Sequence, residues 1–209
     1  MLKVIPNILT LGRFVLTVVF LFMILFSHSP GVADRPFFLD IAFVIFVTAG
    51  ITDMIDGAIA RKLNVTSRFG RMMDPLADKA LVCGAFICFA IIHQPKLFDF
   101  SPPTLSVIQW SVAAVLVLRE VYVTVLRHIA EARGINFAAT FSGKIKMFLQ
   151  SFAIGTIIIK MAHVPVATWG HWFTVVTLLI MVAVTVLSGI RATQRKSWKQ
   201  TSPRVQPPD

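Results

Sequence analysis

Six long apolar segments constrain the fold of this chain more than any other feature of its sequence. They run approximately over Ile8–Ser27, Phe37–Ala60, Asp74–His93, Thr104–Ile129, Gly143–His163 and Trp169–Ile190. A helix needs about 20 mainly apolar residues to cross the hydrocarbon core of a bilayer. Backbone polar groups in hydrocarbon must be satisfied within the segment itself, which favours the α-helix. The sequence therefore predicts an all-α, polytopic membrane protein with six transmembrane helices.

The composition and the charge agree with a membrane protein. The chain has 209 residues, of which 56% are hydrophobic, and a formal net charge of +10. Its basic residues flank the apolar segments and form no polar domain, so we interpret the charge as a topology signal and expect no nucleic-acid partner. Cys83 and Cys88 lie within one apolar segment, five residues apart, and we expect them to be buried without forming a disulfide.

The distribution of basic residues predicts the orientation. Six spans place both termini on the same side, together with the loops 61–73 and 131–142, which have basic flanks. The positive-inside rule then makes this side cytoplasmic in a multi-pass protein of the inner (cytoplasmic) membrane. We expect residues 1–209 to form a single domain in the lipid bilayer, with a short interfacial segment over 1–8 and a disordered tail over 198–209.

Four aspartates stand out near the predicted cytoplasmic ends of the second and third spans. They are Asp53, Asp56, Asp74 and Asp78, in a chain with 10 acidic residues. Residues three or four apart share a helix face, so each pair has one face and the two pairs can converge. Carboxylates next to hydrocarbon are costly, and hard oxygen ligands of this kind suit Mg²⁺ or Mn²⁺. Four of them can hold two ions, the arrangement that clamps a phosphoryl displacement.

The residues around the aspartates fit a phosphate-containing ligand. Gly57, Ala60 and Gly70 leave room for a bulky group, and Arg61 offers a planar cation to a phosphate. Asp74 followed by Pro75 predicts a helix start, unless the helix begins earlier and Pro75 kinks it. The alternative for the aspartates is structural, with the carboxylates ion-paired to basic neighbours. Those neighbours are Arg61, Arg71 and Lys79.

The complete acidic pattern resembles the signature of the CDP-alcohol phosphatidyltransferases. It reads Asp53-x-x-Asp56-Gly57-x-x-Ala60-Arg61, then eight residues, Gly70, three residues, Asp74, three residues, Asp78. The resemblance implies a six-helix membrane fold, a homodimer and metal-dependent transfer of a phosphatidyl group from a CDP-linked donor to an alcohol, with release of CMP. It further implies that the four aspartates bind the metals and that Asp78 is also the candidate general base.

By the same resemblance, the CDP-diacylglycerol pocket is bordered by one set of motif residues. These are Asp53, Gly57, Ala60, Arg61 and Gly70. Further motifs are similar to the branch of the family that uses glycerol 3-phosphate: Ile5-Pro6-Asn7-Ile8-Leu9-Thr10 with Arg13, the run Asp74–Lys79, Arg119-Glu120 with Leu126-Arg127, and Gly143-Lys144-x-Lys146.

An acceptor that is itself a phosphate needs cations of its own. Arg119, Arg127, Lys144 and Lys146 are the candidates, because they lie near the cytoplasmic ends of the fourth and fifth spans. The alternative for Arg119 is a structural ion pair with a carboxylate. Other acceptors of the same chemistry are phosphatidylglycerol, as in a cardiolipin synthase, inositol phosphate and serine. A different class, a divalent cation transporter, also uses intramembrane acids, but it places them at the bilayer centre between repeats, and no repeat is visible here.

Overall fold

The structure is a computed structural model that describes residues 5–29, 36–63, 68–133 and 141–194. In these ranges the chain forms helices and no strands, which confirms the all-α prediction. The helices are α1 (Ile5–Phe26), α2 (Pro36–Leu63), α3 (Arg68–Ile91), α4 (Pro102–Ala132), α5 (Phe141–His163) and α6 (Thr168–Thr193). Each predicted apolar segment corresponds to one helix.

The largest difference from the predicted boundaries concerns the loop at 61–73. Helix α2 continues to Leu63 and α3 begins at Arg68, so most of this segment is helical. Asp74 and Pro75 are therefore not the start of α3; of the two alternatives, the helix start at Asp74 is wrong and the earlier start is confirmed. Proline inside a membrane helix is tolerated because neighbouring groups can satisfy the carbonyl that it leaves without a donor. The part of the acidic motif from Gly70 to Asp78 therefore lies within one continuous helix, α3.

The N-terminal helix also begins earlier than expected. Helix α1 includes Ile5–Ile8, part of the segment predicted to lie at the interface, whereas residues 1–4 and the predicted tail over 198–209 lie outside the described ranges. The helices α4 and α6 are each a few residues longer than their predicted segments.

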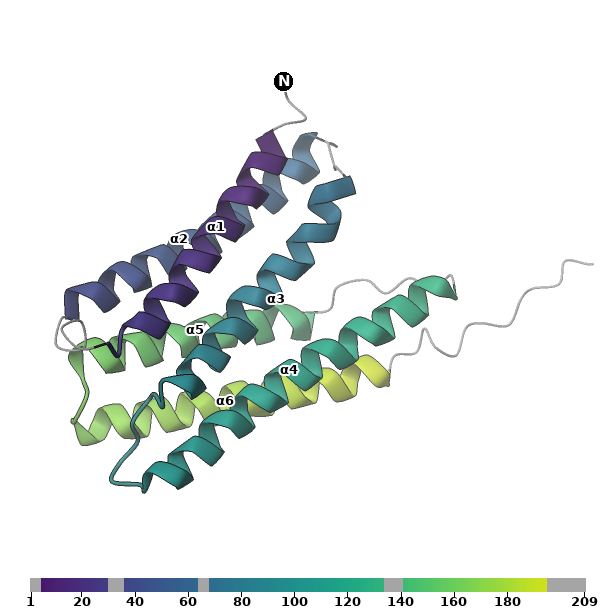
Figure 1. Ribbon diagram of the computed structural model, residues 1–209. Helices are drawn as coiled ribbons and strands as arrows, with labels where there is room; N and C mark the ends of the chain where they lie inside the picture. The colour runs from purple at the N-terminus through teal and green to yellow at the C-terminus, as the bar shows by residue number, and fades with distance from the viewer. Residues whose placement is uncertain (1–4, 30–35, 64–67, 134–140, 195–209) are drawn as a thin grey trace, which may run out of the picture.

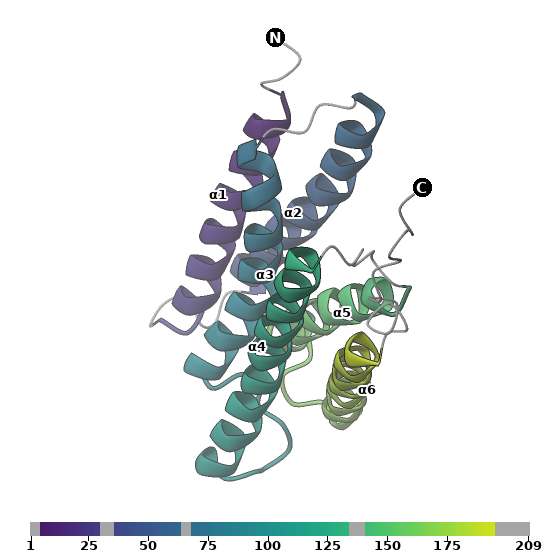
Figure 2. The same cartoon turned by 90° about the vertical axis from the view of Figure 1, so that its right-hand side faces the viewer.

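The six helices pack in a closed ring. Helix α1 contacts α2 and α3, α5 contacts α2 and α6, and α4 contacts α3 and α6, while α3 and α5 also meet across the ring. Figure 1 shows that the beginning of α1, the end of α2 and the beginning of α3 lie together at the top. The ends of α4 and α6 lie at the right of the same view, and the beginning of α5 lies nearer its middle. These helices form two groups, α1–α3 and α4–α6, and Figure 2 shows both groups from the side.

The core lies where the two groups of helices meet. Phe20 of α1 packs against Phe46 of α2 with ring centroids 5.3 Å apart, and neither side chain is exposed by more than a few per cent. Other fully buried side chains come from the end of α3 and from the interior of α4, α5 and α6. They include Phe89, Leu116, Ile154, Ile157, Ile158 and Met181. Cys83 and Cys88 of α3 are free cysteines; Cys88 is buried as predicted, whereas Cys83 is only partly buried.

Large apolar side chains also cover the outside of the molecule. Examples are Phe22, Phe37, Leu118, Phe148 and Leu179, each more than half exposed. Among the residues that the structure describes, two segments are long and apolar enough to cross a membrane, Ile145–His163 of α5 and Thr168–Thr193 of α6, and three shorter apolar segments lie in α1, α2 and α3. An exposed apolar surface of this extent is typical of a protein in contact with lipid.

Candidate active site

The two aspartate pairs lie on the helices that the sequence predicted for them. Asp53 and Asp56 belong to the carboxyl-terminal part of α2, and Asp74 and Asp78 belong to the amino-terminal part of α3. Members of each pair therefore share a helix face. Figure 1 shows these two parts of α2 and α3 at the same end of the molecule. The side chains of residues 53–78 are outside the described set, so the predicted convergence of the carboxylates stays a prediction.

The predicted residues of the donor pocket occupy the same helical segments. Gly57, Ala60 and Arg61 lie in the last turns of α2, and Gly70 lies in the first turn of α3. Their side chains also fall outside the described set. Among the side chains that the structure does describe, no group of three or more His, Cys, Asp or Glu residues is placed to hold a metal ion. The four aspartates remain the candidate ligands, and their oxygen donors suit Mg²⁺ or Mn²⁺.

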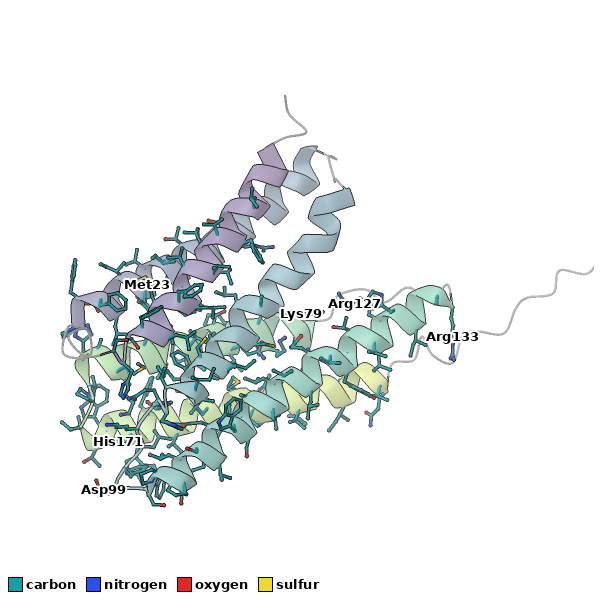
Figure 3. The ribbon with its side chains drawn as sticks, viewed as in Figure 1. Met23, Lys79, Asp99, Arg127, Arg133 and His171 are labelled. Atoms are coloured by element: carbon teal, nitrogen blue, oxygen red, sulfur yellow. The ribbon has the colours of Figure 1, made fainter. Side chains whose placement is uncertain are left out.

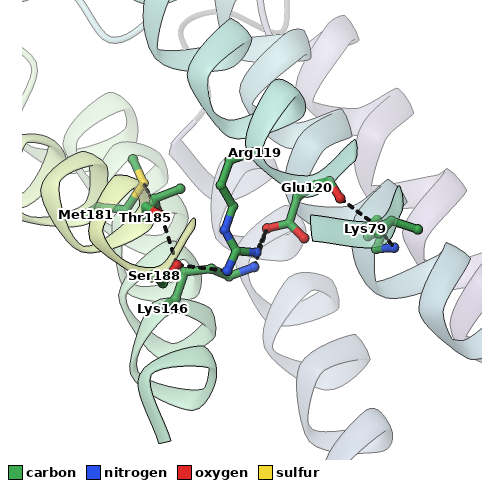
Figure 4. A network of polar contacts seen from close by, with 8 residues as sticks. Lys79, Arg119, Glu120, Lys146, Met181, Thr185 and Ser188 are labelled. Carbon is green, nitrogen blue, oxygen red and sulfur yellow. Dashed lines mark hydrogen bonds and ion pairs between the residues drawn. The ribbon is translucent and has the colours of Figure 1, made fainter. Parts of the chain in front are cut away.

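A polar network begins directly after Asp78 and leads to the second candidate region. Lys79 of α3 donates a hydrogen bond from Nζ to Thr124 Oγ1 of α4. Thr124 in turn donates to the backbone carbonyl of Glu120, at 2.6 Å. The network therefore connects the helix that carries Asp74 and Asp78 to the helix that carries Arg119 (Figure 4).

Four residues from three helices form what we call the Glu120 cluster: Arg119, Glu120, Lys146 and Ser188. Arg119 donates to Glu120 Oε1 at 2.9 Å and to Ser188 Oγ at 2.8 Å. Lys146 Nζ donates to the same Glu120 oxygen. A single carboxylate oxygen on α4 thus holds a guanidinium from its own helix and an ammonium from α5, and Ser188 secures the guanidinium to α6.

The Glu120 cluster is largely shielded and carries more positive than negative charge. The side chains of Arg119 and Glu120 are each 12% exposed, and that of Lys146 is 7% exposed. Two cations share one carboxylate, so the cluster has a net charge of +1, and Lys79 adds a further positive charge nearby. The buried Nε of Arg119 has no hydrogen-bond partner among the described residues. A buried N–H without an acceptor is costly, and an anion placed here would relieve that cost.

The structure brings together two of the four predicted acceptor-site cations. Arg119 and Lys146 meet at Glu120, which also confirms that Arg119 forms an ion pair with a carboxylate. Arg127 lies two turns farther along α4 and is exposed, and Figure 3 shows it near the end of the molecule opposite His171 and Asp99. The side chain of Lys144 lies outside the described residues.

Sequence reasoning missed the roles of Glu120, Thr124 and Ser188. Adjacent residues of a helix do not normally face each other, so the Arg119–Glu120 pair gave no reason to expect a contact. Ser188 lies in an apolar helix and donates to the Thr185 carbonyl at 2.8 Å, a local bond that is common for helical serines. A cation near the beginning of α5 was the available signal for a buried carboxylate partner.

Comparison with known proteins places these features in one context. Residues 3–196 match the family described as CDP-alcohol phosphatidyltransferase. A Bacillus subtilis protein named CDP-diacylglycerol--glycerol-3-phosphate 3-phosphatidyltransferase is 35% identical over 189 residues, covering 88% of this chain and 90% of the relative. The "Probable phosphatidylglycerophosphate synthase" of Mycobacterium tuberculosis is 33% identical over 184 residues, 88% of this chain and 77% of the relative. A Rickettsia typhi protein with the same name as that of Bacillus subtilis is 32% identical, with 76% and 78% covered.

Proposed function

The chain belongs to the CDP-alcohol phosphatidyltransferase family, and from this premise we propose that it transfers the phosphatidyl group of CDP-diacylglycerol to glycerol 3-phosphate. The products are phosphatidylglycerophosphate and CMP, which places the reaction in phospholipid biosynthesis. The names of relatives from several bacteria support this reaction. The observation that carries the choice of acceptor is the Glu120 cluster, a shielded cationic group linked through Lys79 to the helix of the acidic motif.

The donor's diphosphate belongs beside the four aspartates. Asp53, Asp56, Asp74 and Asp78 would hold two Mg²⁺ or Mn²⁺ ions, because four carboxylates supply the hard oxygen ligands that these ions prefer. Bound there, the ions would neutralise the diphosphate and the charge that develops on the leaving CMP.

The motif residues without carboxylates shape the donor pocket. Gly57, Ala60 and Gly70, together with Asp53, border the cytidine diphosphate, and Arg61 supports its phosphates.

The transfer is a substitution at phosphorus. The hydroxyl oxygen of glycerol 3-phosphate forms a bond to the phosphorus that bears diacylglycerol, and the bond from this phosphorus to the bridging oxygen of the diphosphate breaks. CMP leaves with that oxygen. Asp78 positions the hydroxyl and accepts its proton as the general base. Because α3 carries both Asp78 and Lys79, the base and the network that leads to the acceptor cations are neighbours in the chain.

The phosphate of the acceptor binds at the Glu120 cluster. Arg119 and Lys146 supply the charge, and Glu120 fixes their positions while no substrate is bound. Arg127 and Lys144 lie on the same two helices, closer to the cytoplasm, and would guide the soluble phosphate inward. Glycerol 3-phosphate is small and anionic, and it would reach this site from the aqueous side.

The reaction requires a membrane setting, since its donor and product are lipids. All six helices would span the bacterial inner membrane, with both termini and the active site at the cytoplasmic face. The apolar outer surface and the basic loops support this arrangement. A homodimer, expected from the family, completes the proposal.

An acceptor panel with the purified protein tests the proposed function. The protein is supplied with CDP-diacylglycerol, Mg²⁺ or Mn²⁺, and one of glycerol 3-phosphate, phosphatidylglycerol, inositol phosphate or serine. We expect CMP release and phosphatidylglycerophosphate formation with glycerol 3-phosphate, both abolished by a chelator. Turnover with another acceptor and none with glycerol 3-phosphate would refute the acceptor assignment. Metal uptake into sealed vesicles, without CMP release from any acceptor, would favour a transporter.

A further inference from the structure

An apolar groove of about 970 Å³ lies on the opposite side of the ring from α4. Its walls come mainly from α2 and α5, with contributions from α1 and α3, and the beginning of α6 closes one end. Phe152 and Ile159 of α5 and Phe173 of α6 line it, and each is roughly half exposed. The groove also has open space at Gly50, where an added Cβ would meet no atom within 4 Å. It therefore faces the hydrocarbon region with room for an apolar chain.

One end of this groove contains a buried ammonium group. Lys160 of α5 lines the groove and is 4% exposed. Its Nζ donates to the Pro165 backbone carbonyl at 3.2 Å. No carboxylate lies within ion-pairing distance of Nζ in the part of the chain that the structure describes. The acid Asp40 is paired instead with His163, whose Nε2 lies 2.7 Å from Asp40 Oδ1. We call this feature the Lys160 groove.

The charge of Lys160 needs a partner from outside the described chain. An ammonium has three N–H donors, and one is used. A lysine near the end of a membrane helix normally extends its ammonium toward the polar interface. The bond from Lys160 Nζ to the Pro165 carbonyl, in the loop after α5, follows this pattern, although only 4% of the residue is exposed. A charge buried among apolar groups is costly unless it is paired and hydrogen-bonded.

The position of Lys160 indicates the chemistry of the missing partner. Trp169 lines the same end of the groove and is 66% exposed, as expected for an aromatic residue at the membrane interface. Lys146 lies 14 residues earlier in α5, about 21 Å away along the helix axis. The diphosphate of a donor bound at the acidic motif therefore belongs to the other membrane face. The partner of Lys160 must combine an anionic head group with an apolar tail.

We propose that the Lys160 groove binds an anionic phospholipid, with its phosphate on the Lys160 ammonium and an acyl chain along α2 and α5. The head-group end of this site lies at the opposite membrane face from the proposed substrate sites, and the groove extends from there toward Ala49 and Leu81, which are four and three residues from Asp53 and Asp78. The inference rests on the membrane location within the proposed function and does not depend on the transfer reaction. The bound lipid would stabilise the contact between α2 and α5, which joins the two groups of three helices.

Lipid binding to the full-length, delipidated protein in detergent tests this inference. The probes are phosphatidylglycerol and phosphatidylcholine with identical acyl chains, and native mass spectrometry measures the occupancy of each. We expect phosphatidylglycerol to bind roughly tenfold more tightly, because a charge-assisted contact adds to the apolar burial that the two lipids share. Lys160→Met should remove this preference, whereas Lys160→Arg should keep it.

Two further variants separate the groove from general surface effects. Lys96→Met removes an exposed cation from the loop between α3 and α4 and should leave the preference intact. Thr156→Phe, one turn before Lys160 on the groove wall, should weaken binding of both lipids by several-fold. The melting temperature without lipid shows whether each variant is folded, and Lys160→Met should not lower it.

Three results would overturn the inference. One is equal binding of the two lipids by the wild type, and another is an undiminished preference in a folded Lys160→Met variant. The third is dissociation of a wild-type dimer by Thr156→Phe with lipid binding unchanged. That result would mean that a second copy of the chain, and not a lipid, covers the groove.

Discussion

The acidic region at the ends of α2 and α3 and the Glu120 cluster carry opposite charges and are built in different ways. The aspartates are close in sequence, on two consecutive helices, and their spacing alone suggests a shared face. The Glu120 cluster joins Arg119 and Glu120 on α4 with Lys146 on α5 and Ser188 on α6. The residues proposed for the chemical step thus lie close together in the sequence, whereas the proposed acceptor site depends on how distant helices pack.

This difference predicts different kinetic consequences. Changes in the acidic region should lower the maximal rate, because this region acts on the reacting phosphorus. Changes in the Glu120 cluster should mainly raise the KM for glycerol 3-phosphate, because the cluster holds a part of the acceptor that does not react. Each prediction below can break or sharpen this comparison.

The largest expected effect is that of Asp78→Asn. The substitution keeps the size of the side chain and removes its ability to accept the hydroxyl proton, so kcat should fall about 10²–10⁴-fold. CMP release at saturating substrates measures it, and size-exclusion profiles in detergent check folding. Asp99→Asn, in the exposed loop before α4, is the matched control and should retain full activity. Near-normal turnover by Asp78→Asn would remove Asp78 from the chemistry.

Removal of the central carboxylate should be next in size. Glu120→Gln removes the negative charge that Arg119 and Lys146 share, although the amide can still accept a hydrogen bond. Loss of the charge from two charge-assisted hydrogen bonds should cost about 1.5–3 kcal/mol of stability. We expect a lower melting temperature together with a raised KM for glycerol 3-phosphate. A variant with the wild-type melting temperature and KM would show that Glu120 positions neither cation.

A smaller and more selective effect is expected for Lys146→Met. Methionine preserves much of the apolar stem and removes the ammonium, so the KM for glycerol 3-phosphate should rise roughly tenfold, the equivalent of about 1.4 kcal/mol. The KM for CDP-diacylglycerol should change less than twofold. Lys96→Met controls for the loss of a lysine elsewhere. An equal increase in both KM values would contradict the assignment of Lys146 to the acceptor.

The smallest expected effect is that of Ser188→Ala. It removes the hydroxyl that accepts a hydrogen bond of 2.8 Å from Arg119 Nη2, while the ion pair between Arg119 and Glu120 remains. The loss should be about 0.5–1.5 kcal/mol, seen as a small decrease in melting temperature and a KM for glycerol 3-phosphate raised by a few-fold. An effect as large as that of Glu120→Gln would mean that the α6 contact, and not the carboxylate, positions the guanidinium.

Much of the fold could be predicted because apolar length and helix-breaking loops are local properties. The six helices and the positions of the aspartates on α2 and α3 follow from such signals. The boundary at Asp74 and Pro75 could not be predicted by the same reasoning, because Pro75 fits both the first turn of a helix and the interior of a membrane helix. Which of the two applies depends on how the neighbouring helices pack against α3, and the local sequence does not specify that packing.

The Glu120 cluster shows where sequence reasoning stops. Arg119 and Lys146 were predicted to contribute to one site because the expected topology places them on the same membrane side. That Glu120 is their common partner depends on the packing of α4 against α3 and α6 and of α5 against α6. Lys160 is a similar case. Its position in the sequence suggests an interfacial lysine, and only the structure shows its ammonium buried at the end of a groove.

The central claim is that the Glu120 cluster selects an acceptor by its phosphate. The most direct measurement compares kcat/KM for glycerol 3-phosphate with kcat/KM for glycerol, in the wild type and in Lys146→Met. We predict a strong preference for glycerol 3-phosphate in the wild type, reduced roughly tenfold in the variant, with the value for glycerol unchanged. The same preference in both proteins would contradict the claim.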